Sequence, residues 1–383
     1  QGQCRTRLWL YYGEISGLTH HAASMNSLEH QIHYPLGDAL PAECATLEVA
    51  PAVRWVRMGL PFALDHINLW LLRDRQPDAD GALVDGWTIV DCCIDSAATR
   101  AQWEQIFANC LEGLPILRVI VTHMHPDHIG LAHWLCERWG VSLWISATDY
   151  NVARVAVYDP QGFGGEAGAD FYALHGAQDP SFLTHVRGRA SYFPTLVPAL
   201  PARFHRLMDG DILNIGGRAW RCISGYGHAP EHMALFCDEL TTLISGDMVL
   251  PRISTNVSVH ASEPEANPLR LFLNSLLRYL ELPENTLVLP SHGKPFTGLG
   301  MRIEQLQDHH RERLGDILRA AHDHALSAAD TLPILFQRKL DTHQMTFAMG
   351  ESLAHLHFLW MEGKLERLRG TDGIQRFRAT SAR

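Results

Sequence analysis

Residues 117–130 read LRVIVTHMHPDHIG, an apolar run that leads directly into three histidines and one aspartate. The β-branched run predicts a short buried strand, and the four polar side chains, His123, His125, Asp127 and His128, follow it in a loop. Imidazole is the commonest nitrogen ligand for zinc and related metals, and aspartate offers a hard oxygen. Because packing four such groups on one loop is costly without a metal or solvent, this stretch predicts a metal site.

Strand-like and helix-like segments alternate on both sides of this loop, which is the order that places functional groups at the carboxyl ends of strands. Before the loop, the pattern predicts strands at 53–60, 67–74 and 87–91 and a helix at 96–111; after it, a helix at 130–139 and a strand at 141–146. A second β-rich half is predicted from 212–217, 219–225, 233–238 and 241–247, followed by helices at 269–280 and 300–324.

The rest of the sequence indicates further segments and domains. Residues 1–24 lack the pattern of a secretory signal, and we expect them to be a non-native or disordered extension outside the fold. The expected catalytic domain covers 25–300, and within it the Gly-rich segment 150–205 is interpreted as an insertion that forms part of a lid. From about residue 331 the pattern indicates helix, turn, helix and a short hairpin, so 301–383 is expected to form a separate C-terminal domain.

Further motifs follow the first in a recognisable order. The sequence GYGHAPEH supplies His228, ISGD supplies Asp247, and LPSHG supplies His292. With the HxHxDH run, this ordered set resembles the metallo-β-lactamase superfamily over about residues 47–300. VDCC at Asp91 resembles the early strand-ending aspartate motif of that family, although Cys93 stands where a glycine is usual.

The resemblance implies an α+β fold, a four-layer αββα sandwich, here with a C-terminal helical, winged-helix-like extension. It also implies a site for two divalent metal ions, with zinc expected and iron or manganese compatible with the same ligands. Asp91 is interpreted as a partner that orients a metal-bound histidine. One metal would be bound by His123, His125 and His228, the other by Asp127, His128 and His292, and Asp247 would bridge them.

The activity implied by the resemblance is hydrolysis of a thioester or ester carbonyl, as in the glyoxalase II-like and β-lactamase-like thioesterase group. Water between two metals has a pKa near ~7 rather than ~15.7, so hydroxide is available to attack a carbonyl carbon. Asp127 and Asp247 are the catalytic candidates, and Asp127 would assist proton movement. Alternatives are a lactonase, a sulfur-dioxygenase-like oxygenase with one iron, a nuclease or phosphodiesterase, and a non-catalytic binding protein.

Residues that flank the ligands in sequence are candidates for supporting roles, although ordinary loop positions would look the same. Glu231 and His232 are expected to orient His228 or to reach substrate. Arg252 and Asn256 are expected to contact polar groups of a substrate. Two further candidates, for stabilising an oxyanion, are Tyr226 and Lys294.

The composition limits the classes of substrate and partner that the chain is expected to bind. The 383-residue chain has 46% hydrophobic residues and a net charge of −10, which favours a small acyl substrate over nucleic acid. No apolar run has the ~18 residues of a membrane-spanning helix, so a soluble chain is expected. Eight cysteines without CxxC pairs predict a cytoplasmic protein, and the resemblance suggests a homodimer.

Overall fold

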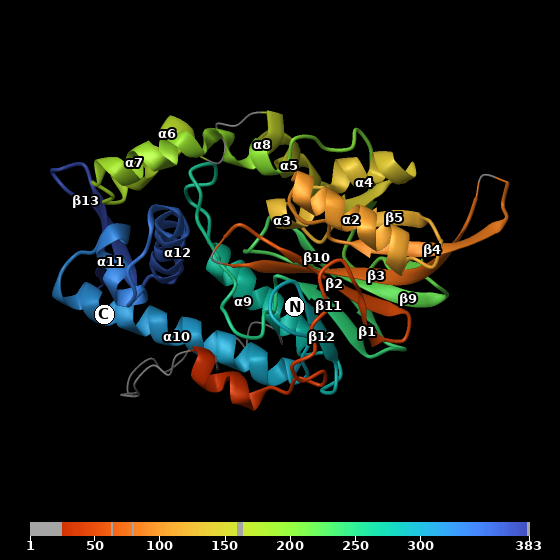
Figure 1. The fold of residues 1–383 in the computed structure, drawn as a ribbon. Coiled ribbons are helices and arrows are strands. Elements are labelled where there is room, and N and C mark those ends of the chain that lie inside the picture. The colour runs from red at the N-terminus through yellow and green to blue at the C-terminus, as the bar shows by residue number, and fades with distance from the viewer. Residues whose placement is uncertain (1–24, 63, 79, 159–163, 381–383) are drawn as a thin grey trace.

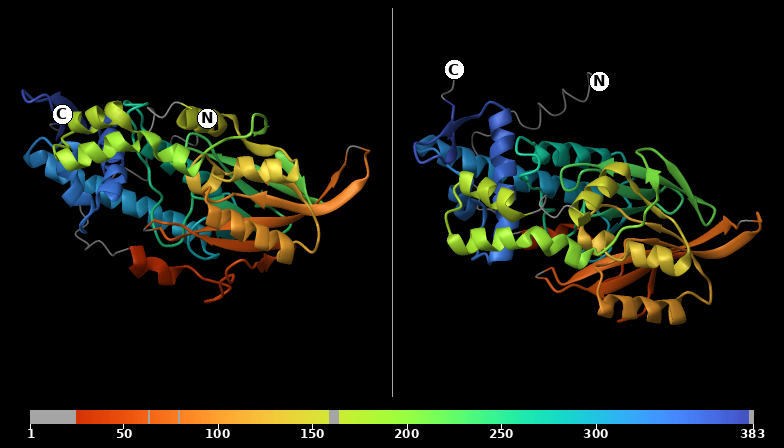
Figure 2. Two further views of the ribbon diagram at one scale, coloured as in Figure 1. Left: turned by 45° about the horizontal axis from the view of Figure 1, so that its top comes forward. Right: turned by 90° about the horizontal axis from the view of Figure 1, so that it is seen from above.

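The computed structural model describes residues 25–62, 64–78, 80–158 and 164–380 (Figures 1 and 2). A seven-stranded sheet has the order β1-β2-β3-β4-β5-β6-β7, antiparallel as far as β4 and parallel from β4 to β7. Its strands confirm the strands predicted before and after the HxHxDH loop. They are β1 (Leu47–Ala50), β2 (Val53–Gly59), β3 (His66–Pro77), β4 (Leu83–Val90), β5 (Ile116–Ile120), β6 (Leu143–Ser146) and β7 (Phe204–Leu207).

A five-stranded sheet is built from the second β-rich half, in the order β12-β11-β10-β9-β8. Strands β8 to β11 are antiparallel neighbours, and β12 lies parallel to β11 at the edge. The strands are β8 (Ile212–Ile215), β9 (Arg218–Gly225), β10 (His232–Cys237), β11 (Thr242–Gly246) and β12 (Leu287–Pro290).

The two sheets pack face to face over an apolar layer. In β2 and β3 the period-2 alternation sends Trp55 and Trp70 to this inner layer, where both are fully buried. Trp220 and Leu235 of the second sheet belong to the same layer, while Val56 and Leu69 point to the opposite face. The alternation therefore gives each strand of this pair two buried faces, because helices cover the outer one.

Helices cover the outer faces of both sheets, which completes the expected four layers (Figure 1). On the seven-stranded sheet, the covering helices are α2 (Ala97–Cys110), α3 (Pro126–Ile129), α4 (Ala132–Trp139), α5 (Ala147–Tyr158) and α8 (Tyr192–Leu196). On the five-stranded sheet, α9 (Pro268–Tyr279) and α10 (Leu299–Asp323) share a core with α11 (Ala328–Leu335) and α12 (Thr342–Met361). The predicted αββα architecture is confirmed.

The C-terminal segment has the predicted order of elements, with α11 and α12 followed by the hairpin of β13 (Leu365–Arg369) and β14 (Gln375–Ala379). Segment 150–205 lacks a clear period in sequence but is largely helical, because it also contains α6 (Gly165–Leu174), α7 (Pro180–Gly188) and η3 (Arg189–Ser191). Its expected bounds fall inside α5 and β7. The segment contacts the C-terminal part, since α7 packs on α12 and Tyr172 Oη donates to the Thr346 carbonyl at 3.1 Å.

An N-terminal segment beginning with η1 (Met25–Gln31) runs beside α10, where Gln305 Nε2 donates to the Leu28 carbonyl at 3.1 Å. The extension predicted for residues 1–24 lies outside the described residues. Within the described chain, no helix combines the length and the apolar character that crossing a membrane requires.

Candidate metal centre

Three imidazoles from two separate loops converge on one point. His123 and His125 follow β5, and His228 lies between β9 and β10. Nε2 of His123, Nδ1 of His125 and Nε2 of His228 form a triangle with edges of 2.9, 3.1 and 3.2 Å. Ligand nitrogens at ~2.0–2.1 Å from one tetrahedral cation are roughly 3.3 Å apart, so this triangle has nearly the size of a metal site.

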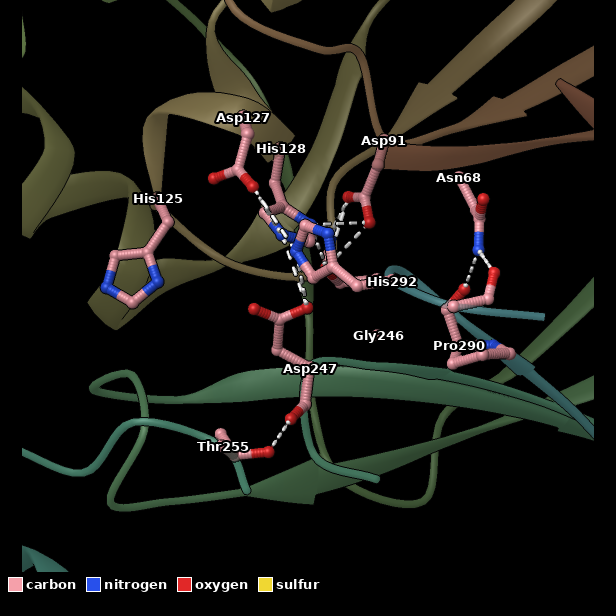
Figure 3. Close-up of polar contacts among 12 residues, drawn as sticks. Asn68, Asp91, His125, Asp127, His128, Gly246, Asp247, Thr255, Pro290 and His292 are labelled. Atoms are coloured by element: carbon pink, nitrogen blue, oxygen red, sulfur yellow. Dashed lines mark hydrogen bonds and ion pairs between the residues drawn. The ribbon is translucent and has the colours of Figure 1, made fainter. Parts of the chain in front are cut away.

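A second group lies beside the first and contains Asp127, His128 and His292 (Figure 3). His292 Nε2 is 3.4 Å from Asp127 Oδ2, and His128 Nε2 is 3.7 Å from the same oxygen. The carboxylate of Asp247 lies between the two groups. Its Oδ2 is 3.3 Å from His228 Nε2, and its Oδ1 is 3.5 Å from both His128 and His292. One carboxylate thus faces both candidate sites.

Buried atoms of this cluster fit cations and little else. Among the described residues, no hydrogen-bond partner satisfies His128 Nε2, His292 Nε2 or Asp247 Oδ1. Buried polar atoms are normally paired, so nitrogen and carboxylate atoms without such partners that point toward one another fit a site for cations. The donor set of nitrogens and carboxylate oxygens is the one that zinc, iron and manganese accept.

Hydrogen bonds on the far side of three rings hold Nδ1 and direct Nε2 toward the centre. Nδ1 of His228 donates to the Asn256 carbonyl at 2.8 Å, and Nδ1 of His292 donates to the His66 carbonyl at 2.7 Å. Nδ1 of His128 donates to Asp91 Oδ2 at 2.8 Å. In a neutral imidazole the proton on Nδ1 leaves Nε2 as a lone pair, so each ring is oriented as a ligand.

The two groups differ in electrostatics. Burial, reinforced by the neighbouring His228, lowers the pKa of His125 to about 3, and burial likewise lowers the pKa of His123. Burial would also lower the pKa of His292, but the carboxylates of Asp247 and Asp127 raise it to about 10. His123 and His125 therefore resist protonation and keep their lone pairs, while the carboxylates around His292 stabilise positive charge on that ring.

Asp91 is held in the left-handed region at φ 63° at the end of β4 and is fully buried. Its Oδ1 accepts from the backbone N–H of Thr122 at 2.8 Å, and its Oδ2 accepts from the Thr122 hydroxyl at 2.9 Å. Asp91 thereby fixes both the start of the metal-binding loop and His128. This places it beside a ligand ring, as the sequence interpretation requires.

His232 lies behind the candidate ligands. It is fully buried, and its Nε2 accepts from the backbone N–H of Asp247 at 3.2 Å. Gly246, at φ 53°, leaves the room for this ring, since a Cβ there would lie 2.1 Å from His232 Nε2. The structure therefore places His232 in contact with Asp247, the expected bridging residue; a role for His232 in orienting His228 or contacting substrate stays a prediction.

The other flanking candidates divide into those near the ligands and those engaged elsewhere. Asn256 orients His228 through its backbone carbonyl. Glu231 Oε2 accepts from the Thr148 hydroxyl at 2.7 Å rather than contacting a ligand. Tyr226 is 37% exposed and its backbone N–H donates to Ser275. The two remaining candidates lie on the wall of a cavity beside the centre, namely Arg252 and Lys294.

Supporting residues without any motif were missed by the sequence interpretation. Asp149 of α5 is fully buried and accepts backbone N–H bonds from Met124 at 2.8 Å and from Glu231 at 2.6 Å. Asn68 of β3 donates to the carbonyls of Pro290 at 2.8 Å and Gly293 at 2.9 Å. Each therefore holds a loop that carries ligands. Asn68 had one sequence signal, a polar residue among apolar neighbours, whereas Asp149 stands in the mixed stretch SATDYNV and had none.

Comparison with known proteins agrees with this geometry. The Metallo-beta-lactamase superfamily model matches residues 82–292, and the model for a Metallo-beta-lactamase-like C-terminal domain matches 314–380. A beta-lactamase domain protein from Burkholderia ambifaria has a solved structure that superposes with a TM-score of 0.86 at 55% identity, covering 93% of this chain and all of that one.

Two curated relatives are more distant. A probable metallo-hydrolase, YqjP, from Bacillus subtilis is 25% identical over 80% of this chain and 92% of its own length. An atrochrysone carboxyl ACP thioesterase from Aspergillus fumigatus is 23% identical over 59% of this chain and 55% of its own. Because the superfamily model alone matches more than half of the sequence, and the fold and the ordered ligand motifs agree with it, the chain belongs to the metallo-beta-lactamase superfamily.

Proposed function

We propose that the protein is a metal-dependent hydrolase that cleaves a thioester or ester carbonyl, with two divalent cations, zinc by preference, at the centre described above. The observation that carries the proposal is the position of Asp247, whose two carboxylate oxygens face two complete ligand groups. His123, His125 and His228 would hold one cation, and Asp127, His128 and His292 the other. When bound, the cations supply Lewis acidity, which lowers the pKa of water and polarises a carbonyl oxygen.

The chain's own residues contribute orientation and proton transfer. The side chain of Asp127 is 18% exposed, against 11% for Asp247 and 1% for Asp91. Asp127 is therefore the carboxylate best placed to take a proton from water and deliver it to a leaving thiolate or alkoxide. Asp91 and the carbonyls that accept from the ligand rings keep those rings in their binding tautomers, so no serine or cysteine nucleophile is required.

Acyl hydrolysis is favoured over the other expected reactions by two observations. One relative that covers more than half of this chain is named as a thioesterase. The net charge of −10 disfavours the phosphate backbone of a nucleic acid. Lactones share the same carbonyl chemistry, so lactone hydrolysis is the second candidate.

Two helical parts would enclose this substrate. The short helix α8 packs against α3, which carries Asp127 and His128. Tyr192 of α8 stacks under the Arg189 guanidinium, whose carbon lies 4.4 Å from the ring centroid. On the C-terminal side, the Val259 N–H donates to the Gly350 carbonyl of α12 at 3.1 Å. We therefore assign α8 and the winged-helix-like C-terminal part to covering the site of a cytoplasmic enzyme rather than to binding nucleic acid.

The test combines metal analysis with a substrate panel. The wild type, Asp247→Ala and a surface control, Asp316→Ala, are assayed for metals per chain and for hydrolysis of acyl thioesters, esters, lactones and a phosphodiester. We expect two metals per chain, and acyl hydrolysis that is abolished by chelation and by Asp247→Ala but retained by the control. One iron with oxygen consumption, or metal without hydrolysis of any carbonyl substrate, would overturn the proposal.

A further inference from the structure

A cavity of about 380 Å³ opens beside His292, on the side of the second ligand group. Its walls come from the end of β2, the loop after β11, the loop after β12 and the N-terminal segment around residues 29–40. Because one wall is a candidate metal ligand, a molecule in this cavity reaches the metal centre directly. The cavity is therefore the natural place for the part of a substrate next to the scissile bond.

Arg57 is the unusual residue of this cavity. Arg57 lies two residues after Trp55 in β2, so both side chains leave the strand on the inner face of the sandwich. Trp55, its neighbour on that face, is fully buried. Arg57 lies opposite Asn68, the residue that holds the loop of His292. Arg57 is partly buried and, within the described part of the chain, forms no ion pair and no side-chain hydrogen bond.

The other two cations of the wall already have ion-pair partners. Arg252 pairs with Glu29 at 3.1 Å, and Lys294 pairs with Asp38 at 2.7 Å. Glu29 also accepts from the Tyr34 hydroxyl at 2.9 Å. Three cations and one carboxylate thus line the cavity, and Asp38 offsets Lys294 from outside it. Beside the wall, the exposed carboxylate of Asp65 lies 2.6 Å from His66 Nδ1, and the hydrogen bond to His66 and the charge of Arg57 both lower the pKa of Asp65. Arg57 is thus the cation of the wall that forms no ion pair within the described residues.

Apolar side chains complete the wall. Leu40 and Ile253 line the cavity and are each 43% exposed, and Leu64 lies with them. A hydrocarbon chain would cover this surface and gain hydrophobic free energy. A guanidinium at one side of an apolar wall matches a ligand that carries both a hydrocarbon part and an anionic group, because planar guanidinium binds carboxylate and phosphate with two parallel hydrogen bonds.

We propose that this cavity is the specificity subsite of the enzyme and that it takes an anionic group, a carboxylate or a phosphate, attached to the acyl or the leaving part of the substrate, with Arg57 as its counter-charge. This inference rests on the proposed function, because it names the substrate class of the same centre. Lys294 and Arg252 act as auxiliary cations, because each already forms an ion pair with a carboxylate of the N-terminal segment. Neutral acyl substrates would reach the centre without this anchor.

The experiment compares substrates that differ only in charge. Glutaryl and pentanoyl thioesters of one neutral thiol test a carboxylate on the acyl side. The pentanoyl thioesters of phosphopantetheine and of pantetheine test a phosphate on the leaving side. Each pair is assayed with the metal-loaded wild type, Arg57→Gln, Arg57→Lys and a control, Arg319→Gln, whose exposed side chain pairs with Asp316 on α10. Thermal unfolding of each variant confirms folding.

We expect the wild type to prefer one anionic substrate over its neutral partner in kcat/KM. Arg57→Gln should reduce that preference on the order of 10- to 100-fold, the size of one charge-assisted contact, while turnover of the neutral substrate changes little. Arg57→Lys should restore part of the preference, and Arg319→Gln should keep all of it. The pair that responds identifies the carboxylate or the phosphate as the anchor. A preference that is absent, or unchanged in Arg57→Gln, overturns the proposal.

A binding arm separates this proposal from the proposed function. Calorimetric titration of the wild type and Arg57→Gln with glutarate and with phosphopantetheine requires no catalysis. If no thioester is hydrolysed but one anion binds the wild type and binds Arg57→Gln at least 10-fold more weakly, the subsite stands and the hydrolase assignment fails. If thioesters are hydrolysed but neither anion binds, or both proteins bind equally, the subsite is wrong and the hydrolase assignment stands.

Discussion

His128 donates from Nδ1 to Oδ2 of Asp91 at 2.8 Å, and both side chains are fully buried. A carboxylate in this position fixes the tautomer of the ring and raises its basicity toward a metal. Replacing Asp91 by asparagine is therefore expected to weaken metal binding roughly 10- to 100-fold. Chelator competition measures the affinity, with Asp85→Asn, a surface position on the same strand, as control. Equal affinities for the two variants would show that Asp91 has no such role.

Gly246 is expected to tolerate no side chain. A Cβ would lie 2.1 Å from His232 Nε2, and the backbone is in the left-handed region at φ 53°. Gly246→Ala should destabilise the fold by about 2–4 kcal/mol through strain and overpacking, and should lower metal content because Asp247 is the next residue. The control is Gly300→Ala, whose Cβ meets nothing within 4 Å. Urea unfolding gives both values, and a loss of stability as large in the control would contradict the explanation.

Asp149 should make stability depend on pH. Burial raises its pKa from 3.8 to about 6, despite the N–H donors that favour the ionised form. A raised pKa means that the unfolded chain ionises first, so the contribution of Asp149 is fully present below about pH 4 and is lost as pH rises through about 6. The loss approaches about 3 kcal/mol from the two pKa values.

The measurement for Asp149 is the free energy of unfolding of wild type and Asp149→Asn between pH 4 and 7.5 at fixed metal concentration. The asparagine does not titrate, and the metal ligands titrate in both proteins, so the difference isolates Asp149. Wild type should lose stability relative to the variant as pH rises from 4 to 6. A difference that stays constant, or changes in the opposite direction, would show that the pKa of Asp149 is not raised.

Gly350 of α12 should couple the C-terminal part to the metal centre. A Cβ at Gly350 would lie 2.6 Å from Ser258 Oγ and 2.7 Å from Ser258 Cβ, and the Ser258 hydroxyl donates to Asn256 Oδ1 at 2.8 Å. Gly350→Ala should cost about 1–3 kcal/mol and weaken metal binding, because the Asn256 carbonyl orients His228. Ser258→Gly should relieve the clash, whereas Ser258→Ala, which keeps Cβ, should not. A double-mutant cycle without coupling would exclude this contact.

The ligand set could be assembled from sequence because its chemistry is local. HxHxDH is a dense run of metal-binding side chains after an apolar strand, and the runs at 53–60 and 67–74 predict strands. The sandwich is what the resemblance carried by the ordered motifs implies. The structure brings all seven expected ligand residues together. The helices of residues 150–205 were not predicted as such, since their burial against α12 and neighbouring helices, rather than their own period, stabilises them.

Residue types and their spacing therefore identify the candidate ligands, and the resemblance that these motifs carry implies the family and its four-layer fold. Which side chains support these ligands became visible only in the folded chain. Asp149 and Asn68 act on backbone groups of loops that are 25 to 225 positions away. His232, next to a ligand motif, accepts from the backbone N–H of Asp247, 15 positions away. A sequence records side chains and their local order, but not which distant backbone N–H or carbonyl will face them after folding, and those partners define the role of a buried polar residue.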